Sequence, residues 1–195
     1  MLISKGKLEL VEETLKEDGR TPLNYYKFIY DEMPCCPDCG APMHERSRLS
    51  GKEGRSFTGM DGTPSKVEIR RVVCGNEACY NHTHPKRDLP DILVPYGRYD
   101  AEVHQAVADG RNEVPCSPST VRRMLKKMAG QLVMLLWAFT EMGMRLSICE
   151  EDCRSADLWS TLRDAAAGFD RWYLRAVKMN VNRFGALYWQ CSDTG

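Results

Sequence analysis

Apolar residues recur with different periods in different parts of the chain. In Lys7–Asp18 (KLELVEETLKED), Leu8, Val11 and Leu15 are three and four positions apart, which predicts a short amphipathic helix. In Lys66–Cys74 (KVEIRRVVC), apolar residues alternate with charged ones, which predicts a strand. We therefore expect the first half of the chain to contain a leading helix, an aromatic segment and β structure.

Helical periodicity returns after residue 99. Asp100–Asp109 (DAEVHQAVAD) has apolar positions at helical spacing, with Asp100 as the expected N-cap. We expect His104 of this helix to lie on the surface. A second helix is predicted to start where Ser117 can cap it and Pro118 occupies its first position.

Two long heptad patterns complete the chain. Apolar residues alternate in steps of four and three from Val121 to Leu146, and again from Leu158 to Ala176. A connector, Ile148–Ala156, separates them. This spacing predicts two long helices that pack as a hairpin or pair with a second copy of the chain.

Composition excludes several classes of protein. The 195 residues carry no net charge, so no global basic field indicates nucleic acid. We expect no signal peptide, because Met1–Leu10 has no apolar core segment, and no apolar run is long enough to span a bilayer. We therefore expect a cytoplasmic protein with reduced thiols and no membrane contact.

Four of the nine cysteines form two close pairs. Cys36 and Cys39 lie in CPDCG, and Cys74 and Cys79 lie in CGNEAC. Two thiolate pairs complete a tetrahedral shell around Zn²⁺, and such a closed site has a structural role. The sequence therefore predicts a structural zinc site.

The ligand set has alternatives. Cys35 precedes Cys36 and could replace it, and His82 or His84 could replace a thiolate, because imidazole also binds zinc. We prefer the four cysteines, because the tight turn directs Cys35 elsewhere.

These patterns predict an α+β fold that is mostly α: a small β zinc ribbon, a helix-turn-helix-like segment and a long C-terminal helical hairpin. The expected boundaries are 1–34 for the N-terminal helix and aromatic segment, 35–90 for the zinc ribbon, 91–130 for the helix-turn-helix-like segment, and 131–195 for the hairpin, a candidate dimerisation element.

The helix after Ser117 carries groups that suit DNA. Hydroxyl and basic side chains that can contact phosphates and guanine edges lie in its first turns: Ser119, Thr120, Arg122, Arg123, Lys126 and Lys127. From residue 44 to 87, nine Lys and Arg residues face five acids, which also suits phosphate. The long separation from the preceding helix, residues 110–116, departs from a standard helix-turn-helix.

Several of these motifs together resemble known bacterial proteins. CPDCG followed by RRVVCGNEAC is similar to the N-terminal zinc ribbon of ISL3-type transposases. With His82-Thr83-His84, LPDILVPYGRYDAEV and SPSTVRR, it resembles an uncharacterised zinc-ribbon family associated with mobile elements. The resemblance spans Cys35 to Lys127. It implies zinc at the four cysteines and suggests DNA binding.

We therefore expect a non-catalytic, zinc-stabilised DNA-binding protein, related to transposases or to transcriptional regulators, that forms a homodimer. The alternative is a protein-interaction scaffold that uses the ribbon and the heptad helices. No catalytic constellation, phosphate-binding loop or small-molecule substrate is indicated by the sequence.

Overall fold

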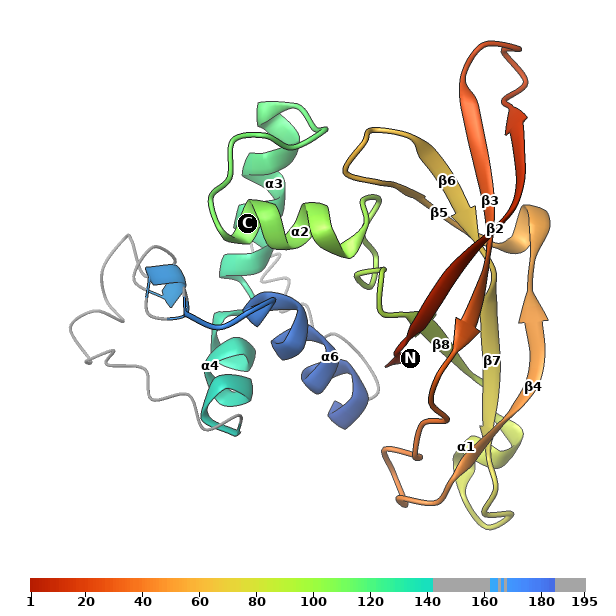
Figure 1. Cartoon of the computed structure of the whole chain (residues 1–195). Helices are drawn as coiled ribbons and strands as arrows, with labels where there is room; N and C mark the ends of the chain where they lie inside the picture. The colour runs from red at the N-terminus through yellow and green to blue at the C-terminus, as the bar shows by residue number, and fades with distance from the viewer. Residues whose placement is uncertain (142–161, 165, 167, 185–195) are drawn as a thin grey trace, which may run out of the picture.

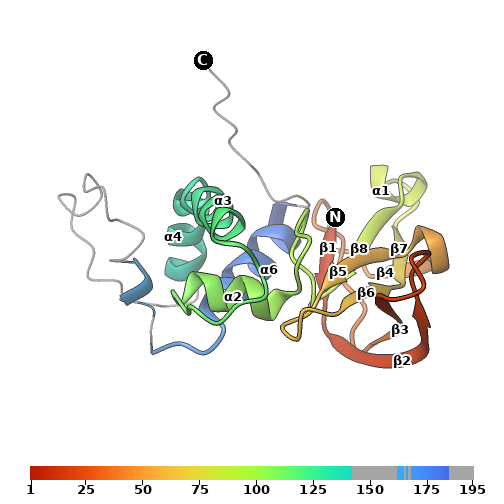
Figure 2. The same ribbon diagram turned by 90° about the horizontal axis from the view of Figure 1, so that it is seen from above.

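The computed structural model describes residues 1–141, 162–164, 166 and 168–184. Two β-sheets lie on one side of the molecule and a group of helices lies on the other (Figure 1). The same separation is visible from above, where α2, α3, α4 and α6 lie beside the sheets (Figure 2).

The first sheet contains β1 (Leu2–Ser4), β4 (Met43–Leu49), β7 (Ile69–Cys74) and β8 (Lys86–Pro90). Its strand order is β1-β8-β7-β4. β1 runs parallel to β8, whereas β7 is antiparallel to both of its neighbours. The strand predicted in Lys66–Cys74 is confirmed, with an interruption at Glu68 where the chain passes from one sheet to the other.

The second sheet contains β2 (Gly6–Leu15), β3 (Pro22–Tyr30), β5 (Arg55–Thr58) and β6 (Pro64–Val67), in the order β2-β3-β6-β5. A short 3₁₀ turn, Gly51–Glu53, precedes β5. β1 leads almost directly into β2 through Gly6. A Cβ at Gly6 would lie 2.1 Å from the Ile29 carbonyl oxygen. The passage of the chain from the first sheet into the second therefore requires glycine at this position.

The helix predicted at Lys7–Asp18 is wrong, because this segment forms β2. Its residues pair with β3 in an antiparallel register that places Leu8 opposite Phe28 and Leu10 opposite Tyr26. KLEL also alternates between charged and apolar residues, so the local pattern suits a strand as well as a helix. Pairing with β3, which follows β2 after residues 16–21, decides between them.

The helices are α1 (Tyr80–Thr83), α2 (Ala101–Ala108), α3 (Pro118–Ala129), α4 (Leu132–Glu141) and α6 (Trp172–Phe184). The predicted starts of α2 and α3 are confirmed. The backbone N–H of Val103 donates to Asp100 Oδ1 at 2.8 Å, and that of Thr120 donates to Ser117 Oγ at 3.3 Å. None of the described helices is long and apolar enough to cross a membrane.

The mostly α fold with a long C-terminal hairpin is also wrong. Strands cover about as many of the described residues as helices do. The first heptad pattern is divided between α3, which ends at Ala129, and α4, which begins at Leu132. In the second, a turn precedes α6, and Phe169 is exposed. The predicted connector, Ile148–Ala156, lies outside the described residues.

The heptad residues do not pack between two helices alone, because they belong to one hydrophobic core that also contains residues of the first sheet. Met124 and Met128 of α3, Leu135 of α4 and Trp172 of α6 pack in the same buried cluster as Ile3 and other residues of the first sheet. The apolar positions of each helix therefore face a shared interior formed by several elements, and no pair of helices buries them alone.

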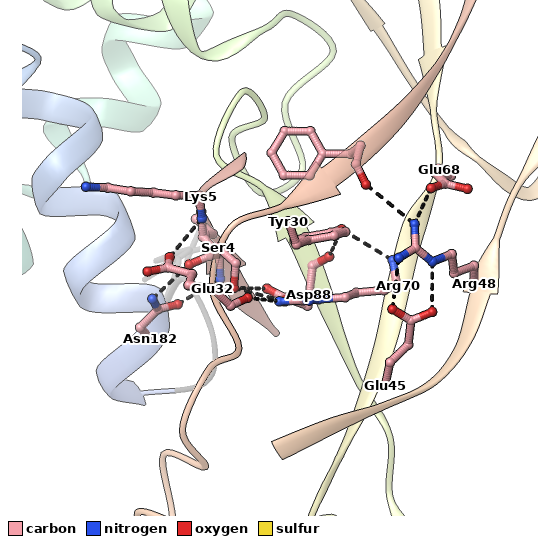
Figure 3. Close-up of polar contacts among 12 residues, drawn as sticks. Ser4, Lys5, Tyr30, Glu32, Glu45, Arg48, Glu68, Arg70, Asp88 and Asn182 are labelled. Atoms are coloured by element: carbon pink, nitrogen blue, oxygen red, sulfur yellow. Dashed lines mark hydrogen bonds and ion pairs between the residues drawn. The ribbon is translucent and has the colours of Figure 1, made fainter. Parts of the chain in front are cut away.

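A buried ion pair joins the strands of the first sheet to β3 (Figure 3). Arg70 Nε lies 2.7 Å from Asp88 Oδ2, and the two side chains are 3% and 0% exposed. Ser4 Oγ also donates to the Asp88 carboxylate, and the Arg70 guanidinium stacks on the Tyr30 ring at 3.7 Å. Asn182 of α6 holds the backbone of Ile3, donating to its carbonyl oxygen and accepting from its N–H.

Candidate metal centre and basic helix

Two backbone turns present the paired cysteines. In the first, the Gly40 N–H donates to the Cys36 carbonyl oxygen at 2.8 Å, and Gly40 has a φ of 74°. That left-handed conformation favours glycine, which explains the glycine of CPDCG. The turn lies just before β4.

The second turn lies at the end of β7, where Cys74 is the last strand residue. The Asn76 side chain accepts a hydrogen bond from the Ala78 N–H at 3.0 Å, and the Cys79 N–H donates to the Asn76 carbonyl oxygen. This Asx-type turn accommodates the two additional residues of CGNEAC. Antiparallel pairing of Met43 with Cys74 brings the two turns together.

The four predicted thiols converge. Their sulfur atoms lie within 4.8 Å of one another, with Cys36 Sγ 3.7 Å from Cys79 Sγ and Cys39 Sγ 3.5 Å from Cys74 Sγ. A tetrahedral zinc–thiolate site has sulfur–sulfur separations of about 3.8 Å, as its bond lengths require. Disulfide bonding would need a separation of about 2.05 Å. The arrangement fits a metal ion.

Neighbouring groups stabilise negative charge on one sulfur. Burial raises the pKa of Cys36, but hydrogen bonds from Asn81 and from the backbone N–H groups of Asp38 and Cys39 outweigh it and lower that pKa to about 6. Burial raises the pKa of Cys74 to about 12. The cluster therefore holds one thiolate readily and needs a cation to hold several.

Asn81 is a part of this site that sequence reasoning missed. It is buried, and its Nδ2 donates to Cys36 Sγ at 3.1 Å and to Asp38 Oδ2 at 2.7 Å. Its place two residues after Cys79, in the first turn of α1, is the signal that could have indicated it. Such contacts orient the ligands of metal sites.

The alternative ligands lie outside the thiol cluster. Cys35 is exposed, and its backbone bridges to Pro42. His82 Nδ1 pairs with the Cys74 carbonyl oxygen at 2.9 Å, and the His84 ring stacks on Tyr80. Among the described residues, the cluster of potential metal ligands contains the four cysteines alone.

The predicted DNA-contacting residues lie along α3, and three of them, Thr120, Arg123 and Lys127, also border the space between α3 and the 94–99 loop. Ser119, Arg122, Arg123, Lys126 and Lys127 are exposed and Thr120 is partly so. Met124 and Met128 are buried on the opposite side of the helix. Arg123 also donates to Thr120 Oγ1 at 3.2 Å. The structure thus separates an apolar side from a basic side.

The other predicted basic region is weaker than its composition suggests. Arg70 is buried against Asp88, and Arg48 forms ion pairs with both Glu45 and Glu68. Because acidic groups of the protein neutralise these arginines, they are poorly placed to contact phosphate. We therefore base no nucleic-acid contact on them.

Residues 36–124 match a protein family described as "Domain of unknown function (DUF6431)". No curated protein and no solved structure matches the chain. The matched stretch contains all four clustered cysteines and ends within α3, so the chain is similar to this family across the thiol cluster and the start of the basic helix.

Proposed function

We propose that this protein binds one Zn²⁺ ion at Cys36, Cys39, Cys74 and Cys79 and uses α3 to bind duplex DNA. The zinc site has a structural role, because four thiolates leave no open position for water or substrate. The ion links the turn before β4 to the end of β7 and so fixes the end of the first sheet.

Substitution of single cysteines tests the metal assignment. We expect Cys36→Ser to lose zinc, measured as metal per chain by mass spectrometry, and to lower the free energy of unfolding, because three thiolates bind zinc less tightly than four. Cys35→Ser is the matched control, since Cys35 is adjacent but exposed, and it should keep one zinc per chain. Full zinc retention in Cys36→Ser would show that the ligand set is wrong.

The basic side of α3 is the observation that carries the DNA proposal. Its four cations are all exposed, and no acidic residue occurs between Pro118 and Ala129. Burial of Met124 and Met128 holds the helix against the core, so the cations are presented on a fixed element. A helix of this kind suits the major groove, with its cations on phosphates or guanine edges.

The resemblance to the N-terminal region of ISL3-type transposases agrees with this proposal. A role at mobile elements rests on that resemblance alone. The separation of α2 from α3 by residues 109–117 differs from the short turn of a standard helix-turn-helix. The proposed interface is therefore α3 itself, with α2 as its packing partner.

A salt series with mixed-sequence duplex DNA tests the proposal. If the four cations contact phosphates, log K should fall with log salt with a slope of about −3 to −4. Arg122→Ala should weaken binding and reduce the magnitude of the slope by about 1. Lys27→Ala is the control, because Lys27 is an exposed cation of β3, a strand that lies on the sheet side of the molecule, away from α3 (Figure 1).

Two outcomes would contradict DNA binding through α3: no binding even at low salt, or equal effects of Arg122→Ala and Lys27→Ala. The first would favour the protein-interaction alternative. The second would indicate that any surface cation contributes equally, without a defined interface.

A further inference from the structure

A cavity of about 290 Å³ lies between the loop at residues 94–99 and the helices α2, α3 and α6. Its walls include Tyr96, Arg98, His104, Arg123, Met124 and Lys127. At the volume that a water molecule occupies in the liquid, this space accommodates about ten non-hydrogen atoms. It is thus near the lower size limit of small-molecule sites.

His104, one of the residues that line this cavity, has unsatisfied polar atoms. Its side chain is buried, contrary to the surface position expected from the sequence, with an exposed fraction of 8%. Neither ring nitrogen has a hydrogen-bond partner among the described residues. A Cβ at Gly97 would lie 2.6 Å from His104 Nε2, so glycine leaves room for the ring. Buried polar atoms are normally paired, so these nitrogens indicate a missing partner.

The charge of the cavity selects the class of that partner. Arg98, Arg123 and Lys127 contribute cations, and no carboxylate is among the described residues that line the cavity. Burial, with a smaller contribution from Lys127, lowers the pKa of His104 to about 4. The imidazole is therefore neutral at pH 7 and offers one donor and one acceptor. An anionic ligand matches the cations of the cavity, and a further polar group on that ligand can pair with the imidazole of His104.

Most of the other lining residues are aromatic or apolar. Tyr96, Tyr99 and Tyr173 contribute aromatic rings, and Met124 contributes a flexible thioether. Aromatic and methionine side chains pack well against planar rings. We propose that this cavity binds a small aromatic carboxylate, with its carboxylate at Arg123 and Lys127 and its polar substituent at His104. This inference goes beyond the proposed function and does not depend on DNA binding.

Isothermal titration of the full chain with 4-hydroxybenzoate tests the proposal. We expect saturable binding of one molecule per chain. The neutral analogue 4-hydroxybenzamide should bind roughly tenfold or more weakly, because it loses the charge-assisted contacts. Thymidine monophosphate should bind more weakly still, since it has about twice as many non-hydrogen atoms as the cavity accommodates.

Two neighbouring arginines give a matched pair of variants. Arg123 lines the cavity and Arg122 does not, although both are exposed on α3. Arg123→Gln should weaken 4-hydroxybenzoate binding roughly tenfold or more, whereas Arg122→Gln should leave it unchanged. His104→Leu should also weaken binding. If His104→Leu does not fold, as judged by circular dichroism, the Arg123 and Arg122 pair decides the matter.

Three results would overturn the proposal. The first is no saturable binding of 4-hydroxybenzoate up to about 10 mM, well above the millimolar affinities of weak ligands. The second is equal weakening by Arg122→Gln and Arg123→Gln, which indicates general attraction to cations. The third is tighter binding of thymidine monophosphate or of the benzamide, which contradicts the assigned carboxylate.

Discussion

Arg70 and Asp88 show how a single pair of residues can hold several strands. Both side chains are buried, Ser4 Oγ donates to the Asp88 carboxylate, and Arg70 Nη2 donates to the Glu32 carbonyl oxygen. A charge removed from water is tolerated when its partner and hydrogen bonds replace that water. The pair therefore fixes the relative positions of β1, β3, β7 and β8.

Asp88→Asn should lower the free energy of unfolding by about 3–5 kcal/mol, because it leaves the Arg70 charge buried without a counterion. Urea unfolding measures this change. The control is Glu45→Gln, which breaks an ion pair with Arg48 whose side chains are both 33% exposed. That change should cost less than about 1 kcal/mol. Similar losses in the two variants would contradict the assigned role of the buried pair.

His104 makes stability depend on pH. Burial lowers its pKa from 6.5 to about 4 in the folded protein, and Lys127, Arg98 and Arg123 line the same cavity. Between these two pH values the unfolded chain binds a proton that the folded protein does not. Stability is therefore fully present above about pH 6.5 and is lost as pH falls towards 4.

This loss should reach about 1–3 kcal/mol, the range that such a pKa difference implies. It is measured as the change in the free energy of unfolding between pH 7 and pH 5, in parallel for the wild type and His104→Gln. The variant lacks the titrating ring, so its loss should be smaller. Any effect of acid on the thiol cluster is common to both proteins. An equal loss in both would show that His104 is not responsible.

At the residue scale, spacing in the sequence predicted the cysteines but not their surroundings. The thiol pairs are visible because each lies within a few residues. Asn81 and the cavity position of His104 depend on which strands and helices meet. His104 occupies a regular position in a predicted helix, and its sequence neighbours do not reveal that the 94–99 loop covers it.

Among the elements, the boundary between α3 and α4 decides how the helices pack. Gly130 follows α3 with a φ of −66°, an ordinary helical value, and a Cβ there would meet carbonyl oxygens no closer than 3.4 Å. The break therefore does not depend on a conformation that only glycine adopts. Gln131 is buried beside it and accepts a hydrogen bond from the Tyr173 hydroxyl, which anchors the turn to α6.

Gly130→Ala should accordingly raise the free energy of unfolding by about 0.4–1 kcal/mol, because alanine restricts the unfolded chain without strain in the folded one. The comparison is Gly110→Ala, at a φ of 73° and with Arg163 within 2.6 Å of the added Cβ. That variant should be destabilised by about 1–2 kcal/mol. Thermal or urea unfolding of the two variants measures both effects. Destabilisation by Gly130→Ala would mean that the break needs glycine.

The elements that were predicted correctly carry their signals locally. Asp100 and Ser117 cap their helices through contacts three residues away, and β7 ends at a thiol turn. The errors concern β2 and the heptad patterns, where the same residues suit two structures. For Leu8 and Leu10 the choice depends on β3. For Leu135 it depends on a core that also contains residues of the first sheet.

For the whole molecule, the sequence predicted a β part carrying the thiols and helices after it. It did not predict that the two parts share one core. Residues before position 5 and after position 172 meet in this core. A local sequence pattern cannot indicate contacts between residues so far apart along the chain. At the start of the chain, β1 pairs with β8 and is held by α6.

The position of β1 has a consequence for the order in which the chain folds during synthesis. Ser4 precedes its partner Asp88 by 84 residues, and Ile3 precedes Asn182 by 179. At translation rates of about 5–20 residues per second, β1 waits roughly 4–17 s for β8 and about twice as long for α6. Between the synthesis of β8 and that of α6, the pairing of β1 with the edge of β8 lacks the hydrogen bonds from Asn182 that hold Ile3. Nascent chains on one messenger are therefore most exposed to pairing with each other before α6 leaves the ribosome.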